Sequence, residues 1–137
     1  MEQHLYQLQR HLPEQLHLDN LIRLGERHLR VTEVLTVPQG DMRLPVRVIE
    51  MGSQAAGAPA IGFFGGVHGV ERIGTQVILS WLHSLIHRLQ WDDQLHRRLE
   101  HIRLVFMPMV NPGGIWRRTR SNPNGVDLMR NAPVEAD

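Results

Sequence analysis

Residues 60–89 constrain the fold of this chain more than any other stretch. An uninterrupted apolar run, AIGFF (60–64), leads through a glycine-rich corner, GGVHGVERIG (65–74), into apolar residues at helical spacing. A second apolar run, IRLVFMPMV (102–110), follows. This order predicts two parallel strands joined by a right-handed helical crossover. Because ligands bind beyond the carboxyl ends of such strands, we expect the corner and the segment after residue 110 to meet on one rim.

The other segments complete a mixed α/β sheet flanked by helices. Periodicity predicts short helices at 1–12 and 14–28, a strand hairpin at 29–37 and 43–51, and a short helix at 91–101. The strand at 60–64 is apolar on both faces, which is typical of a central strand covered by helices. The crossover helix is expected to bury one apolar face, formed by Val70, Ile73, Val77, Ile78, Trp81, Leu82, Leu85, Ile86 and Leu89.

The last 27 residues, 111–137, show no periodicity and are interpreted as a long loop. A structureless stretch of this length in a compact domain is usually functional. We therefore divide the chain, as one incomplete α/β domain, into a helical lead-in (1–28), a sheet with helices (29–110), and an active-site loop with a truncated end (111–137).

Composition excludes several classes of protein. The chain has 137 residues with 42% hydrophobic content, enough for the core of one small domain. A formal net charge of +1 gives no field that favours nucleic acid or an anionic membrane. With no cysteine, disulfides and thiolate metal sites are excluded. No segment has the apolar core of a signal peptide or the length of a membrane span, so we expect a cytoplasmic protein without nucleic-acid or membrane partners.

The glycine-rich corner carries a candidate metal site. His68 and Glu71 are three residues apart at the start of the expected helix, so their side chains point the same way. Imidazole and carboxylate are common zinc ligands, and a His, His, Glu set leaves one position for water. The alternative is a solvated helix start, in which Glu71 favours the helix dipole and His68 is merely exposed.

The loop after residue 110 carries a cluster of arginines. Arg117, Arg118, Arg120 and Arg130 stand there against a single acid, Asp127. Guanidinium groups bind carboxylates bidentately and stay charged, so this cluster indicates an anionic substrate group. The alternative is a solvated basic loop. A nucleic-acid patch is disfavoured because the segment has one aromatic residue.

Four motifs in these two segments resemble the zinc carboxypeptidase family, the carboxypeptidase A-like metallopeptidases. HGVE (68–71), NPGG (111–114), WRRTR (116–120) and GVDLMRN (125–131) stand in the order of that family's H-x-x-E, NPDG, WRKTR-like and GVDLNRN elements. The likeness covers about residues 29–131, which is most of this chain but only the first part of a family catalytic domain.

The resemblance implies roles for four residues. His68 and Glu71 match the first two of three zinc ligands. Arg117 matches the arginine that polarises the scissile carbonyl, and Arg130 matches the one that binds the substrate's terminal carboxylate. Fixed positive charge beside zinc stabilises the negative charge that develops during amide hydrolysis.

Two features depart from the family pattern. The family's third zinc ligand, a histidine, and its glutamate general base come later than Asp137, so we expect this chain to be incomplete for catalysis. Met129 stands where the family usually has an asparagine that helps to bind a terminal carboxylate. This replacement keeps the hydrolase interpretation but puts C-terminal exopeptidase specificity in doubt.

The sequence thus predicts a zinc-dependent hydrolase of peptide or amide bonds next to an anionic group, too short to be active alone. Two alternatives stay open. One is a deacylase of N-acyl amino acids, similar to the succinylglutamate desuccinylase and aspartoacylase branch. The other is a non-catalytic fragment that binds anions. Because the apolar strand at 60–64 lacks a partner from the rest of such a domain, we also expect self-association through an exposed sheet edge.

Overall fold

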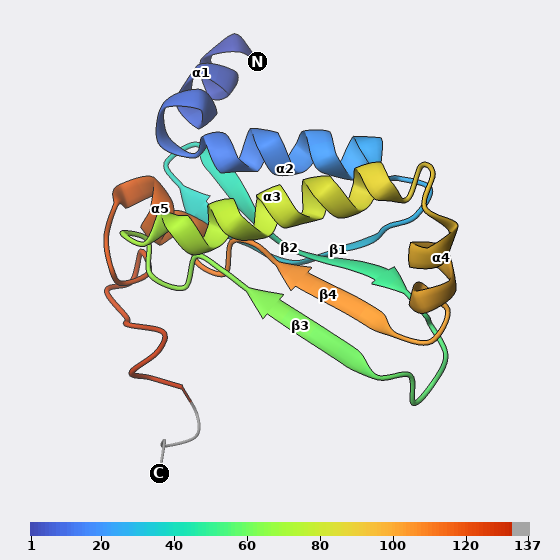
Figure 1. The fold of residues 1–137 in the computed structure, drawn as a ribbon. Helices are drawn as coiled ribbons and strands as arrows, with labels where there is room; N and C mark the ends of the chain where they lie inside the picture. Colours follow the sequence, from blue (N-terminus) through green and yellow to red (C-terminus); the bar gives the residue numbers. More distant parts are fainter. Residues whose placement is uncertain (133–137) are drawn as a thin grey trace.

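A computed structural model of the chain describes residues 1–132 and contains a four-stranded mixed sheet with helices packed on it (Figure 1). The helices are α1 (Glu2–His11), α2 (Pro13–Leu24), α3 (Arg72–Arg88), α4 (Asp93–Leu99) and α5 (Pro112–Arg117). The strands are β1 (Arg30–Gln39), β2 (Met42–Gly52), β3 (Ala60–Phe64) and β4 (Arg103–Met107). The prediction of a mixed α/β fold is confirmed.

The order of strands across the sheet is β1-β2-β4-β3. The hairpin strands β1 and β2 pair antiparallel, and β2 also pairs antiparallel with β4. β3 and β4 are parallel and α3 lies between them in sequence, which confirms the predicted crossover. The carboxyl ends of β3 and β4 therefore point toward the same rim, where α5 and the start of α3 lie (Figure 1).

The core lies between the sheet and the layer formed by α2 and α3. Leu18 and Leu21 of α2 and Leu79, Leu82 and Ile86 of α3 are almost fully buried there. From the sheet, Ile49 and Phe106 are completely buried, and Phe106 stacks against Phe63 of β3 at 5.3 Å between ring centroids. Buried positions on α3 recur at helical spacing because this helix presents one stripe to the sheet and α2.

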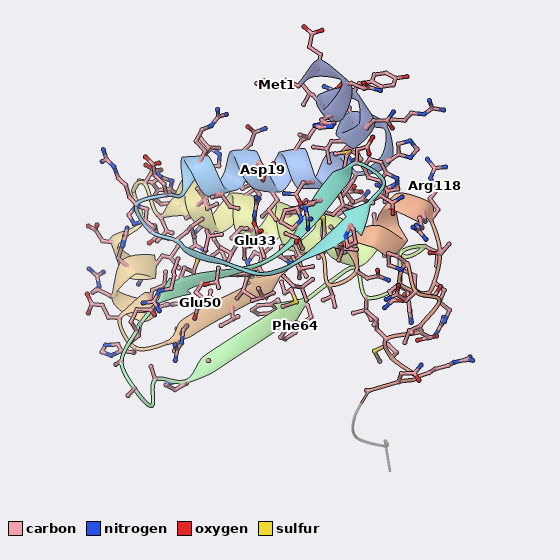
Figure 2. All side chains as sticks on the ribbon, turned by 180° about the vertical axis from the view of Figure 1, so that it is seen from behind. Met1, Asp19, Glu33, Glu50, Phe64 and Arg118 are labelled. Atoms are coloured by element: carbon pink, nitrogen blue, oxygen red, sulfur yellow. The ribbon has the colours of Figure 1, made fainter. Side chains whose placement is uncertain are left out.

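The interpretation of β3 as a central strand covered by helices is wrong for the part of the chain that the structure describes. β3 lies at the edge of the sheet and pairs only with β4. Ile61 and Phe64 keep 48% and 61% of their surface exposed, and Phe64 is visible on β3 in the reverse view (Figure 2). An apolar run indicates that both faces of a strand are buried, but it does not identify the strand or helix that packs against them.

The expected buried face of α3 is half correct. Ile78, Leu82, Leu85, Ile86 and Leu89 are buried, as predicted. The other members of the face, Val70, Ile73, Val77 and Trp81, are exposed. The apolar stripe is wider than the surface that α2 and the sheet cover, so periodicity alone could not separate the two halves.

No helix within residues 1–132 is long and apolar enough to cross a membrane.

Candidate metal and substrate site

The glycine-rich corner after β3 packs directly against the segment after β4. The backbone of Gly65 donates to Met107 and accepts from Val110, and Gly66 accepts from Asn111. At Gly69 the approach is so close that a Cβ would lie 1.9 Å from the carbonyl carbon of Gly114 in α5. Only glycine allows this approach. The predicted convergence of the corner and the arginine-bearing segment on one rim is therefore confirmed.

The segment after β4 is not wholly a loop, because it begins with α5. Asn111 caps this helix by accepting a hydrogen bond from the backbone of Gly114 at 2.8 Å, and Pro112 takes the first helical position. The Asn111 amide also donates to the Val67 carbonyl at 3.1 Å. The interpretation of 111–137 as one long loop is thus wrong at its start, and the Asn-Pro pair is the local signal for the helix. Residues 133–137 lie outside the described part.

His68 lies at the centre of the site. It is 9% exposed, and its Nδ1 is 3.5 Å from Oε1 of Glu71, the residue immediately before α3. Its Nε2 is 3.3 Å from Oδ1 of Asp127, which is 59 residues further along the chain. His68 is therefore not the exposed histidine of the alternative interpretation, because both ring nitrogens face carboxylates.

Asp127 is held in place by several donors. Arg120 Nε donates to its Oδ2 at 2.7 Å, and the backbone N–H groups of Met129 and Arg130 donate to Oδ1 at 3.0 and 3.2 Å. The Arg120 hydrogen bond, followed by the Arg130 backbone and His68, holds the pKa of the Asp127 carboxyl well below its usual range. Asp127 is thus ionised at neutral pH.

Asp127 and Glu71 face opposite nitrogens of His68. A carboxylate can only accept, so with a metal on Nδ1 the Nε2 nitrogen would carry the hydrogen that is donated to Asp127. A carboxylate behind a histidine in this way fixes the tautomer and raises the basicity of the other nitrogen, as it does in many zinc sites. His68 and Glu71 therefore fit zinc by donor type and direction.

The described residues nevertheless hold an incomplete donor set for zinc. No group of three or more histidine, aspartate or glutamate side chains placed to hold a metal ion occurs within residues 1–132. Catalytic zinc sites of this type take three protein ligands. His68 and Glu71 would supply two.

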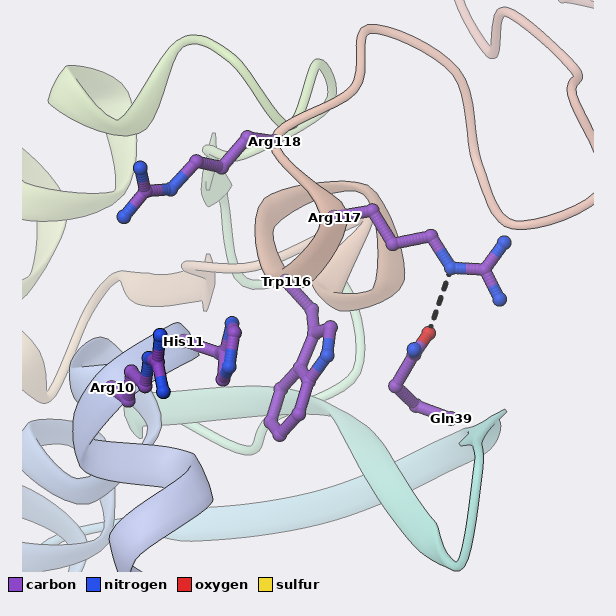
Figure 3. A pocket seen from close by; sticks show the side chains of 6 residues that line it. All are labelled: Arg10, His11, Gln39, Trp116, Arg117 and Arg118. Atoms are coloured by element: carbon purple, nitrogen blue, oxygen red, sulfur yellow. Dashed lines mark hydrogen bonds between the residues drawn. The ribbon is translucent and has the colours of Figure 1, made fainter.

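The arginines of the segment divide between two sides of the rim. Arg120 and Arg130 face Asp127, with Arg130 Nε at 3.7 Å from Oδ2. Arg117 instead points to the end of β1, where its Nε donates to Gln39 at 2.9 Å (Figure 3). Its Nη1 donates to the Pro123 carbonyl at 3.2 Å. No hydrogen bond or ion pair connects Arg117 with His68 or Glu71 in the described part of the chain.

Met129 and Arg130 lie on the exposed side of the rim. Met129 is 61% exposed, and the Arg130 side chain keeps 79% of its surface in contact with solvent. Their backbone N–H groups bind Asp127, so both residues are anchored close to His68 while most of each side chain is exposed to solvent.

Sequence reasoning missed the role of Asp127. Its one signal was its position as the single acid among the arginines of residues 111–131. The long separation from His68 along the chain meant that only the fold could show the contact.

Comparisons with known proteins identify the family of the chain. The sequence profile of the family described as "Zinc carboxypeptidase" matches residues 1–135. The chain belongs to the zinc carboxypeptidase family. Carboxypeptidase SOL1 of Arabidopsis thaliana is 28% identical over 107 residues, which cover 76% of this chain but 22% of that protein. The chain thus spans about a fifth of the length of this carboxypeptidase.

Solved structures share the fold. A metallo-carboxypeptidase from Burkholderia cenocepacia superposes with a TM-score of 0.67 at 21% identity, over 87% of this chain and 32% of its own. A succinylglutamatedesuccinylase/aspartoacylase from Rhodobacter sphaeroides gives a TM-score of 0.51 at 23% identity, over 79% of this chain and 31% of its own. The segment seen here therefore corresponds to about a third of each of these structures.

Proposed function

We propose that this chain provides the first part of the active site of a zinc-dependent hydrolase, which cleaves a peptide or amide bond next to an anionic group. One observation supports this activity above all. The Nδ1 of His68 and the carboxylate of Glu71 face each other at 3.5 Å, while Asp127 holds the opposite nitrogen of His68.

Each side chain has a separate task in this proposal. His68 and Glu71 would hold zinc, which supplies Lewis acidity at the scissile carbonyl when bound. Asp127 keeps His68 in the tautomer that leaves Nδ1 free. Arg130 attracts the anionic group of the substrate. Arg117 is assigned to the developing oxyanion by family resemblance, and it would have to leave Gln39 to reach the zinc.

A deacylase of N-acyl amino acids is the second candidate. The shared fold with the Rhodobacter sphaeroides desuccinylase/aspartoacylase keeps it open.

The test uses the full-length protein that carries this segment. Its zinc content is measured, and its turnover is compared on peptides with free C-termini, the same peptides with amidated C-termini, and N-acyl amino acids. We expect zinc and hydrolysis of at least one free-acid or amidated peptide, and loss of both in His68→Ala. The matched control is His101→Ala, which changes an exposed histidine near the opposite end of β4.

Three results would contradict the peptidase proposal. Turnover confined to N-acyl amino acids would favour the deacylase. Anion binding without zinc or turnover would favour a non-catalytic module. Full activity of His68→Ala would remove the metal site on which the proposal depends.

A further inference from the structure

A groove runs along Trp116 between α1, α5 and the β1–β2 hairpin. Two cavities of about 490 and 300 Å³ share Trp116 and Gln39 in their walls. We name this surface the Trp116 groove. One end is lined by Arg10, His11, Arg117 and Arg118, and the other by glutamines of α1 and the β1–β2 turn with Asp41. In Figure 3, Arg10, His11 and Arg118 lie on one side of the indole, whereas Arg117 points the other way, toward Gln39.

Among residues 1–132, the positive charge at the basic end has no carboxylate partner. The hydrogen bonds of the Arg117 side chain there go to neutral acceptors, the Gln39 amide and the Pro123 carbonyl. Within residues 1–132, Arg10 and Arg118 form no ion pair with an acid, although four other arginines of the chain do so within 3 Å. Guanidinium groups gathered without acids repel one another, and a bound anion relieves this repulsion.

The floor of the groove is pre-formed. The His11 ring stacks on Trp116, with centroids 4.7 Å apart and planes 21° apart, so the indole is held between α1 and α5. Arg72 attaches the end of α1 to α3, because it donates to the His11 carbonyl at 3.0 Å. It also donates to the carboxylate of Glu14, in α2, at 2.7 and 2.8 Å. A site whose side chains are already ordered loses less entropy when it binds a ligand.

Together these features distinguish a binding site from a solvated basic loop. We propose that the Trp116 groove binds an acidic peptide segment, with its carboxylates at Arg10 and Arg118 and its backbone amides along the glutamine-lined end. Primary amides can both donate to and accept from a peptide backbone, which suits a peptide better than a phosphate chain. Asp41 at the amide end repels negative charge and so directs the carboxylates to the other end.

The acidic segment is the part of a peptide substrate that lies away from the bond cleaved at the zinc corner. This assignment rests on the proposed peptidase function, because it states that the peptide substrate carries acidic residues away from the cleaved bond. The lining of the groove includes Arg117 but neither His68 nor Glu71. Binding in the groove can therefore be measured without zinc and without turnover.

The experiment measures fluorescence anisotropy of labelled hexaglutamate and hexaglutamine peptides mixed with the chain at low salt. We expect hexaglutamate to bind more tightly than hexaglutamine, and its affinity to fall with added salt. Arg10→Gln and Arg118→Gln should each weaken hexaglutamate binding about 3- to 10-fold, as the loss of one exposed charge-assisted contact does. Arg97→Gln, which removes the same charge from exposed α4, should leave the affinity unchanged.

Nitrogen-15 NMR spectra locate the binding site independently. The chain has three tryptophans, and Trp81 and Trp91 lie on or just after α3, outside the lining of the groove. We expect hexaglutamate to shift the indole N–H resonance of Trp116 alone.

Several results would overturn the proposal. The first two are equal affinities for hexaglutamate and hexaglutamine, and a loss of affinity in Arg97→Gln as large as in Arg10→Gln or Arg118→Gln. The others are no shift of the Trp116 indole resonance, and a single-stranded oligonucleotide of equal charge that binds as tightly as hexaglutamate. Tight hexaglutamate binding with the expected variant pattern, in a full-length protein that hydrolyses no peptide, would keep the groove and reject the peptidase function. The two proposals thus fail separately.

Discussion

The carboxylate of Asp127 connects the arginine-rich segment to the histidine of the corner. It accepts from Arg120, from two backbone N–H groups and from His68. Its fixed negative charge orients the imidazole and compensates two of the four arginines of the segment. The remaining two, Arg117 and Arg118, face the Trp116 groove instead. One acid thus divides the positive charge of this loop between two surfaces.

Met129 is expected to determine substrate preference at the rim. Its exposed thioether can pack against an apolar group of the substrate, so Met129→Asn in the full-length protein should lower kcat/KM on the natural substrate a few-fold. The assay compares both proteins on matched peptides with free and amidated C-termini. A gain of about 10- to 100-fold confined to the free acids, the value of a hydrogen bond to a charged group, would instead establish carboxypeptidase specificity.

Asn111 is expected to be the most sensitive polar residue of the site. It is 3% exposed and joins the backbones of Gly114 and Val67, so Asn111→Ala removes a helix cap and leaves the Val67 carbonyl without this donor. We expect the free energy of unfolding to fall by about 2 kcal/mol. Urea denaturation checks this value, with exposed Asn124→Ala as the control. A loss of under ~0.5 kcal/mol would mean that water replaces both hydrogen bonds.

Among the elements, α4 carries a pH-dependent cap. The Leu95 backbone N–H and then the Arg88 side chain lower the pKa of Asp92 below its ordinary value. A carboxyl with a lowered folded-state pKa stabilises the fold above the unfolded-state pKa of about 4, and this contribution is lost as the pH falls through the folded-state pKa.

Asp92→Asn keeps an acceptor for the cap but removes the charge. The variant should therefore be less stable than the wild type near pH 6, and the difference should shrink as the pH falls below about 4. Thermal unfolding at pH 6 and pH 3 measures both differences. A difference that stays the same at both pH values would show that the charge contributes nothing.

The two edge strands differ in how well they resist pairing with another chain. β1 carries charged residues, a register shift between Glu33 and Leu35, and Pro38 near its end. β3 has none of these, and its outer edge exposes Ile61 and Phe64. Bulges, charged residues and proline usually protect an edge strand from pairing with another chain. β1 has these features and β3 does not, so β3 is the unprotected edge of the sheet.

We therefore expect this chain to self-associate through β3. Ile61→Lys places a charge on the edge and should shift the molecular mass measured by light scattering toward that of a monomer. Leu24→Lys, at an exposed apolar position on α2, is the matched control and should change nothing. A monomer at high concentration for the unmodified chain would contradict the prediction.

In the whole molecule, the ion pair between Arg72 and Glu14 links the amino-terminal helices to the glycine-rich corner that carries His68 and Glu71. Arg72, the residue after Glu71, binds the buried carboxylate of Glu14 through two nitrogens and also the His11 carbonyl. Breaking a buried pair leaves an uncompensated charge, which is costly. α1 and α2 are therefore attached to both proposed sites, to the zinc corner through Arg72 and to the Trp116 groove through His11.

Two ligands should hold zinc weakly in this chain. Calorimetric titration is expected to show weak binding that His68→Ala abolishes and Asp127→Asn reduces. The imidazoles of His83 and His87 stack 4.5 Å apart on α3, so the titration is done in a His83→Gln background, which removes that pair. Tight one-to-one binding that depends on His68 would contradict the prediction, because it requires a third ligand.

The sequence by itself determined the local structure and half of the site. Strand periodicity and the glycine corner gave the parallel crossover, and the close spacing of His68 and Glu71 in sequence placed them together. The Asn-Pro pair at the start of α5 is also a local helix signal, although the lack of periodicity after residue 110 predicts a loop there. Each of these features depends on residues that are close together in sequence, so a short stretch of sequence is enough to predict it.

Only the tertiary structure decided which surfaces are covered and which distant residues meet. It placed β3 at an edge, exposed half of the apolar stripe of α3, brought Asp127 to His68, and stacked His11 on Trp116. Each of these outcomes depends on partners far away in sequence. A periodic pattern reports that a face avoids water, whereas the partner that covers it is selected by the packing of the whole chain.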